Sequence, residues 1–242
     1  MLYINHEKKA IFIHIPKTAG SYISNTLVKY YGFTNYLNVL VNKRPDHNSV
    51  CMINHFPNIL TGNQLYDNSF FNKVIGILNY CQSSEYINQQ CGMDSEKWNT
   101  YFKFCFIRHP YFRILSAWNH INKIFSNVLP FNLYISQNKY NYSNIEYAHI
   151  FMSQTDQIKD VDGSCGMNII GRFEYLEQDL RYILNKIGIN DICHISGEKI
   201  NSSKINNEYD SNYLRLNKNI ISILNNLFDD DFNNFHYRKI IF

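Results

Sequence analysis

The sequence has no apolar run of about 18 residues, the length that a membrane-spanning helix needs. Its first residues also reach Glu7, Lys8 and Lys9 without the apolar stretch of a signal peptide. We therefore expect a soluble, cytoplasmic protein. None of its six cysteines forms a C-x-x-C pair, which argues against a zinc or thioredoxin-like site. We expect reduced thiols, with a Cys81–Cys91 pair only in an exported protein.

Charge of one sign is also scarce, since the net charge is only +3. So small an excess does not indicate a nucleic-acid partner. What the chain does have is length and apolar content, with 242 residues of which 45% are apolar and 18% charged. These values predict one globular α/β domain over residues 1–242.

The clearest pattern runs from Ala10 to Tyr31. Residues 10–15 form an apolar run typical of a buried strand, residues 16–20 form a turn, and the next residues have helical spacing. Strand, tight turn and helix together favour anion binding, because the first N–H groups of a helix have no intrahelical partner. Lys17 would add a positive charge, and the Thr18 and Ser21 hydroxyls would add donors.

This loop differs from the Walker pattern G-x-x-x-x-G-K-[ST]. Lys17 comes three residues before Gly20, and no glycine opens the loop. We therefore expect a shorter cradle that holds no metal. The alternative is a strand-to-helix turn that merely exposes a lysine.

A second unit repeats the first. The apolar run 101–107 predicts a strand, Arg108 follows it, and the next helix carries Arg113 and Ser116. Two guanidinium groups and a hydroxyl near one helix N-terminus suit a second phosphate, because the arginine fork matches phosphate oxygens. The alternative for Arg113 is a solvated helix residue.

Two further features allow more than one interpretation. His55 follows a short apolar patch, which fits either a ligand group at a strand end or a histidine in a turn. The polar stretch 195–207 fits either a loop that closes over an anion or a solvated loop. Residues 167–173 and 175–186 predict a strand and an amphipathic helix. The acidic run 229–231 predicts a solvated helix end.

Four blocks together resemble the Golgi-type carbohydrate O-sulfotransferases, the group that includes the heparan sulfate 2-O-sulfotransferases. They are HIPKTAGSYI at 14–23, FCFIRHPYFRILSAW at 104–118, IIGRFEYLEQDL at 169–180 and DDDFNNFHY at 229–237. The resemblance implies a P-loop-like three-layer α/β sandwich, with a central, mostly parallel sheet flanked by helices. It also implies 3′-phosphoadenosine 5′-phosphosulfate (PAPS) as sulfuryl donor, no metal, and a carbohydrate or other hydroxyl-bearing acceptor. A truncated member would belong in the Golgi lumen.

The resemblance also implies roles for particular residues. The 5′-phosphosulfate would lie on the loop made by Lys17, Thr18, Ala19, Gly20 and Ser21. Arg108 and Ser116 would hold the 3′-phosphate, and His55 would be the general base. A loop would close over the nucleotide, and its residues would be Asn201, Ser202, Ser203 and Lys204. Two rival hypotheses remain, namely an ATP-dependent kinase of the P-loop type and a nucleotide-binding relative without catalysis.

Overall fold

The structure is a computed structural model of the whole chain, and it describes residues 2–35, 95–125, 130–138, 151–158, 164–195 and 217–242. The chain folds into two compact units. The first comprises Met1–Ile15, Ala19–Ile107 and Asp156–Gly197, and the second comprises Pro16–Thr18, Arg108–Thr155 and Glu198–Phe242. That a single domain spans residues 1–242 stays a prediction.

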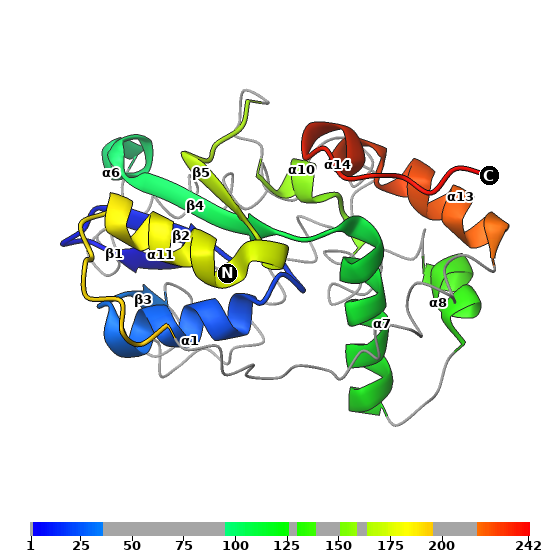
Figure 1. Cartoon of the computed structure of the whole chain (residues 1–242), viewed down its shortest axis with the longest axis horizontal. Coiled ribbons are helices and arrows are strands. Elements are labelled where there is room, and N and C mark those ends of the chain that lie inside the picture. The colour runs from blue at the N-terminus through cyan, green and yellow to red at the C-terminus, as the bar shows by residue number, and fades with distance from the viewer. Residues whose placement is uncertain (1, 36–94, 126–129, 139–150, 159–163, 196–216) are drawn as a thin grey trace, which may run out of the picture. The chain divides into compact units, whose positions relative to one another are not determined.

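The first unit is built on a five-stranded sheet in the order β3-β1-β2-β4-β5 (Figure 1). The strands are β1 (Leu2–Asn5), β2 (Ala10–Ile13), β3 (Thr34–Asn35), β4 (Phe102–Ile107) and β5 (Ile169–Arg172). β2, β4 and β5 run parallel, whereas β1 pairs antiparallel with both β2 and β3. The predicted strands are therefore confirmed, and so is the α/β class with a parallel centre.

β1 and β3 are not among the strands that the sequence predicts. β1 forms a hairpin with β2, and residues 6–9 make the turn. Asn5 stabilises this turn because its Oδ1 accepts the Lys8 N–H at 2.8 Å. Its Nδ2 donates to the Tyr31 carbonyl at 2.7 Å, which ties the hairpin to the end of the first helix.

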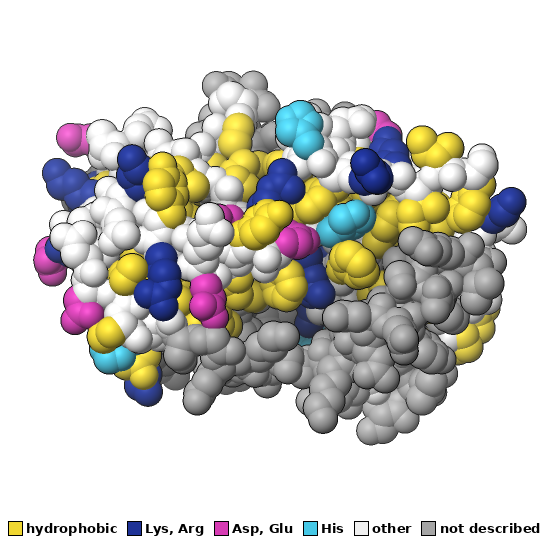
Figure 2. Space-filling model, viewed as in Figure 1, with side chains coloured by type: hydrophobic (Ala, Val, Ile, Leu, Met, Phe, Trp, Pro, Cys, Tyr) yellow, Lys and Arg dark blue, Asp and Glu magenta, His cyan; other side chains and the backbone are white. Residues whose placement is uncertain are grey.

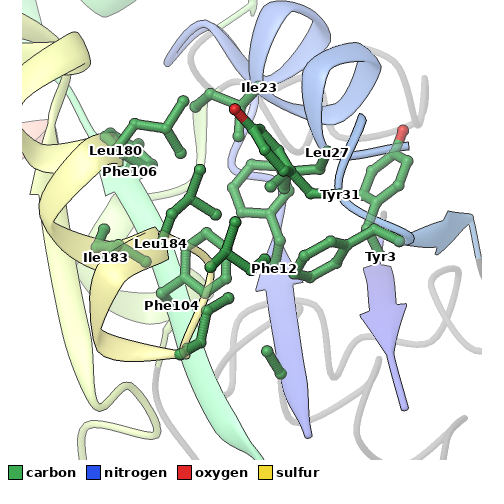
Figure 3. Close-up of a cluster of buried hydrophobic side chains, with 14 of the residues drawn as sticks. Tyr3, Phe12, Ile23, Leu27, Tyr31, Phe104, Phe106, Leu180, Ile183 and Leu184 are labelled. Carbon is green, nitrogen blue, oxygen red and sulfur yellow. The ribbon is translucent and has the colours of Figure 1, made fainter. Parts of the chain in front are cut away.

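Two helices cover one face of the sheet. They are α1 (Gly20–Tyr30) and α11 (Leu176–Lys186), and the latter follows the 3-10 turn η2 (Phe173–Tyr175). Figure 3 shows their side chains packed on Phe12, Phe104 and Phe106. Ile11, Cys105 and Ile107 alternate with those residues along β2 and β4, and they are buried too. Both faces of the sheet are thus covered, as a three-layer arrangement requires.

The remaining described helix of the first unit is α6 (Ser95–Thr100), which lies just before β4. The short helix α10 (Gln154–Gln157) contains the point at which the second unit gives way to the first. None of the helices in the described ranges is long and apolar enough to cross a membrane.

The second unit is helical where it is described. Its helices are α7 (Pro110–Phe125), α8 (Phe131–Asn138), α13 (Lys218–Leu227) and α14 (Asp229–Asn234). They share a core of aromatic and aliphatic side chains, which includes Tyr134, Phe151, Leu224 and Phe228. The predicted helix after residue 110 and the predicted C-terminal helix are both confirmed.

Gly171 in β5 provides a test of the first unit's packing. A Cβ at this position would lie 2.5 Å from Cε1 of Phe106, a fully buried ring. We expect Gly171→Ala to lower the free energy of unfolding by about 1–3 kcal/mol, because overpacking a core forces neighbours to shift. Urea denaturation measures this change.

The control is Gly188→Asn. Gly188 is exposed with φ 77°, and no heavy atom lies within 4 Å of its Cβ position. Asn tolerates this backbone region, so stability should change by less than about 0.5 kcal/mol. A Gly171→Ala protein as stable as the wild type would contradict the described packing.

Candidate functional site

The candidate site begins in the loop between β2 and α1. Lys17 and Ala19 have φ values of 69° and 66°, in the left-handed region that residues with a Cβ rarely adopt. Each such residue costs on the order of 1–3 kcal/mol, and such strain gathers at ligand-binding sites. Ala19 is also the N-cap of α1. Alanine has no side-chain oxygen to accept from the first helical N–H groups, which favours an anion at this helix end.

Gly20 lies against the His14 side chain, a neighbour that was not predicted from the sequence. A Cβ on Gly20 would lie 1.8 Å from Cδ2 of His14 and 1.9 Å from its Nε2. The His14 ring in turn stacks on Phe12, with 6.2 Å between centroids and 11° between planes. The imidazole therefore fills the space beside Gly20, and a Cβ at this helix start would force the His14 ring to move. The sequence feature that could have indicated this contact is His14, the first residue of the motif HIPKTAG.

Sheet topology brings the two predicted phosphate-binding segments together. β2 and β4 are adjacent and parallel, and Ile13 pairs opposite Cys105. Their carboxyl ends therefore lie at the same edge of the sheet, where ligands of parallel α/β folds bind. The Lys17 loop follows β2, and Arg108 is the first residue after β4.

Lys17 and Arg108 are in direct contact. Arg108 is largely buried, and its NH1 donates to the Lys17 carbonyl oxygen at 3.4 Å. The pKa of Lys17 falls from its ordinary value of 10.5 to about 8, first because burial disfavours the charged amine and second because Arg108 is positive. Two partly buried cations repel each other, so an anion that binds to both would be strongly favoured.

The structure also describes Thr18, Ser21 and Ser116, the other predicted residues of the two motifs. Thr18 is fully buried, and Ser21 is exposed in the first turn of α1. Ser116 is half-buried in the second turn of α7. His55 lies outside the described residues, and so do Asn201, Ser202, Ser203 and Lys204.

The structure places Arg113 differently from both interpretations of the sequence, a phosphate ligand and a solvated helix residue. It is fully buried, its NH2 donates to the Met152 carbonyl at 2.5 Å, and its guanidinium lies over the Phe228 ring at 5.3 Å. Burial lowers the pKa of Arg113, while the charge of Asp231 acts in the opposite direction. Arg113 is therefore neither a solvated residue nor a phosphate ligand, but a charge inside the second unit.

The acidic run also differs from the expectation. Asp229 and Asp230 are exposed, and Asp229 pairs with Lys239. Asp231 is fully buried and accepts the backbone N–H groups of Gln154 and Thr155 at 2.9 and 2.8 Å. A solvated helix end is thus right for the first two aspartates and wrong for the third.

The described part of the surface in Figure 2 carries charges of both signs. Figure 2 shows Lys and Arg side chains interspersed with Asp and Glu over the described part of one face, rather than gathered into a single-sign patch.

In the described ranges, no group of three or more His, Cys, Asp or Glu side chains is placed to hold a metal ion.

A family model described as "Sulfotransferase family" matches residues 1–238, nearly the whole chain. The chain belongs to the sulfotransferase family. No curated protein and no solved structure matches it. Membership supports sulfuryl transfer as the general reaction, and it implies a hydroxyl-bearing acceptor and PAPS as donor. The kinase hypothesis is not favoured.

The electrostatic effect of Arg108 on Lys17 gives a prediction that needs no ligand. Arg108→Met should raise the pKa of Lys17 above about 8, because one of the two causes of its shift is removed. The pKa should stay below 10.5, since burial is the larger cause. An NMR titration of the lysine Cε resonance, assigned with Lys17→Arg, measures it.

Arg238→Met is the matched control, because Arg238 is exposed and its loss removes the same charge from the protein. It should leave the Lys17 titration unchanged. Equal midpoints in the wild type and Arg108→Met would mean that Arg108 does not act on Lys17.

Proposed function

We propose that this sulfotransferase moves a sulfuryl group from PAPS to a hydroxyl of a carbohydrate, in the manner of the heparan sulfate 2-O-sulfotransferases that it resembles. PAPS supplies an activated sulfuryl group on a phosphate leaving group. The observation that carries the proposal is the contact of Lys17 with Arg108, next to a helix start with a left-handed cap. Two cations and open N–H groups suit a donor that carries several anionic groups.

The proposed donor site divides into two parts. Lys17, Thr18, Ala19, Gly20 and Ser21 would hold the 5′-phosphosulfate through backbone N–H groups, hydroxyls and the lysine amine. A cation held beside the bridging oxygen stabilises the negative charge that builds up there during transfer. The sulfuryl group and the acceptor oxygen must also be aligned, and a rigid loop favours this alignment.

The second part would hold the 3′-phosphate. Arg108 has a planar guanidinium that matches phosphate oxygens, and Ser116 would add a hydroxyl donor. The loop residues Asn201, Ser202, Ser203 and Lys204 would close over the nucleotide. These assignments rest on the family motifs, with the burial and orientation of Arg108 as added support.

For the acceptor, the proposed base is His55. Its imidazole would take the proton from the attacking hydroxyl, a task that suits a group with an ordinary pKa of about 6.5 at neutral pH. The proposal for His55 rests on its place in the sequence, between the two phosphate-binding motifs.

Transfer of radiolabelled sulfate from PAPS to a panel of glycans tests the function directly, and the proposal predicts labelling of at least one glycan. Lys17→Ala should reduce turnover about 100-fold or more, the scale of losing one preorganised donor to a developing charge. Lys29→Ala is the control, since Lys29 is an exposed lysine in the last turn of α1. Near-normal turnover of Lys17→Ala would remove Lys17 from the site.

His55→Ala separates the base from the donor site. It should abolish transfer while leaving the affinity for 3′-phosphoadenosine 5′-phosphate unchanged in calorimetry, because a base contacts the acceptor and not the nucleotide. Full activity of His55→Ala would exclude this histidine as base. A wild-type protein that binds the nucleotide but labels no glycan would point to a relative that has lost catalysis or takes another acceptor.

A further inference from the structure

A continuous path of hydrogen bonds joins the C-terminal helix α14 to Arg108. Asp231 Oδ2 accepts the backbone N–H of Gln154 at 2.9 Å and the Gln154 side-chain Nε2 at 3.2 Å. The same Nε2 donates to the Arg108 carbonyl at 2.8 Å, and Gln154 Oε1 accepts the Arg108 N–H at 2.9 Å. The Gln154 amide therefore clamps both backbone groups of Arg108, as a neighbouring strand would.

The clamp works in only one orientation of the amide. Oε1 must face the Arg108 N–H, and Nε2 must face its carbonyl. A carboxylate is acceptor-only, so Asp231 bonds to Nε2 and repels Oε1. The Arg108 N–H and carbonyl set this orientation, and Asp231 supports it by accepting from both the backbone N–H and the Nε2 of Gln154, which fixes the place of the amide.

The path is closed to water. Asp231 and Gln154 are fully buried, and Thr155 and Arg108 nearly so. A second bond from Thr155, whose N–H donates to Asp231 Oδ1 at 2.8 Å, fixes the carboxylate itself. Buried and joined by these hydrogen bonds, the Asp231 carboxylate, the Gln154 amide and the Arg108 backbone have few alternative positions.

Asp231 also has a plain structural role, because it offsets the buried charge of Arg113. That role alone explains why a carboxylate is tolerated in this core. It does not explain the pairing of Gln154 with both backbone groups of Arg108, which Arg113 does not require.

We infer that Asp231 is a positioning residue for the donor site: through Gln154 it fixes the backbone of Arg108, and thereby the guanidinium that bonds to the Lys17 carbonyl. The inference rests on the proposed function, in which Arg108 holds a phosphate of the donor. It assigns a role to the third aspartate of the acidic run, which lies more than a hundred residues along the chain from Arg108.

Three variants test the inference. Asp231→Asn keeps the shape but removes the carboxylate charge and replaces one acceptor oxygen by a donor, so the bonds that hold Gln154 and Thr155 are weakened. Gln154→Met removes the clamp yet keeps the backbone N–H bonds to Asp231 and the partner of Arg113. The double variant completes the cycle. Leu224→Ala is the stability control, because Leu224 is fully buried in the same core, outside the path.

The first measurement is the affinity for 3′-phosphoadenosine 5′-phosphate in calorimetry, at a temperature where circular dichroism shows each variant folded. Asp231→Asn and Gln154→Met should each weaken binding about tenfold or more, the scale of a displaced hydrogen bond to a charged group. The double variant should be little worse than either single variant, because both act on one clamp. Leu224→Ala should lower the melting temperature and leave the affinity unchanged.

The second measurement is the pKa of Lys17, which reports the place of Arg108 without any ligand. Moving Arg108 away from Lys17 weakens its effect, so both single variants should raise the Lys17 pKa, by less than is expected of Arg108→Met, while Leu224→Ala should not. If the wild type binds no nucleotide but these pKa changes occur, the proposed function fails and the positioning role stands.

Two results would overturn the inference. One is a folded Asp231→Asn protein with wild-type affinity and an unchanged Lys17 pKa. The other is an additive double variant, which would mean that Asp231 and Gln154 act separately. Should Asp231→Asn fail to fold, Gln154→Met decides alone, and unchanged affinity and Lys17 pKa in that variant reject the clamp.

Discussion

The constraint on which the site depends is the closeness of two like charges. Arg108 is largely buried and bonds to the Lys17 backbone carbonyl, and the pKa of the partly buried Lys17 amine is lowered to about 8, first by burial and second by the charge of Arg108. The two positive charges repel each other in the free protein, and a bound anion that contacts both offsets this repulsion. The fold holds both residues because they follow adjacent parallel strands, whose carboxyl ends share one edge. A sulfotransferase, whose donor is strongly anionic, gains from cations that are already in place.

The backbone of the loop between β2 and α1 is strained, which is also typical of a ligand-binding loop. Lys17 and Ala19 adopt left-handed conformations without the help of glycine, while the glycine of the motif, Gly20, leaves room for the His14 ring beside it. An alanine cap leaves the helix start open where serine or aspartate would have bonded to it. Each of these choices reduces stability, and each keeps donors available at the loop. Local rules are broken at this loop, as they often are at functional sites.

The sequence predicts what is local and repeated. Strand β2, helix α1, strand β4 and helix α7 follow from apolar runs that change period at a turn, and Lys17 and Arg108 follow from their places at strand ends. It did not predict β1, because its pairing depends on a turn whose geometry comes from the Asn5 side chain. It misjudged Arg113 and Asp231 for a common physical reason. A charged residue at helical spacing is normally solvated, and only the tertiary partner, which is distant in sequence, shows that it is buried.

The buried polar groups of the second unit need an explanation other than stability. Transferring Arg113 and Asp231 from water is costly, and apolar residues of similar volume often stabilise a core as well or better than a buried ion pair. Apolar contacts do not fix the orientation of a side chain, because dispersion forces have little directional preference. Hydrogen bonds to both the oxygen and the nitrogen of one amide do fix it. Gln154 makes such bonds, because its side-chain amide lies between the Asp231 carboxylate and the backbone of Arg108. A core that includes Asp231 and Gln154 therefore gives up some stability for a defined position of Arg108, the residue that we propose to hold a phosphate of the donor.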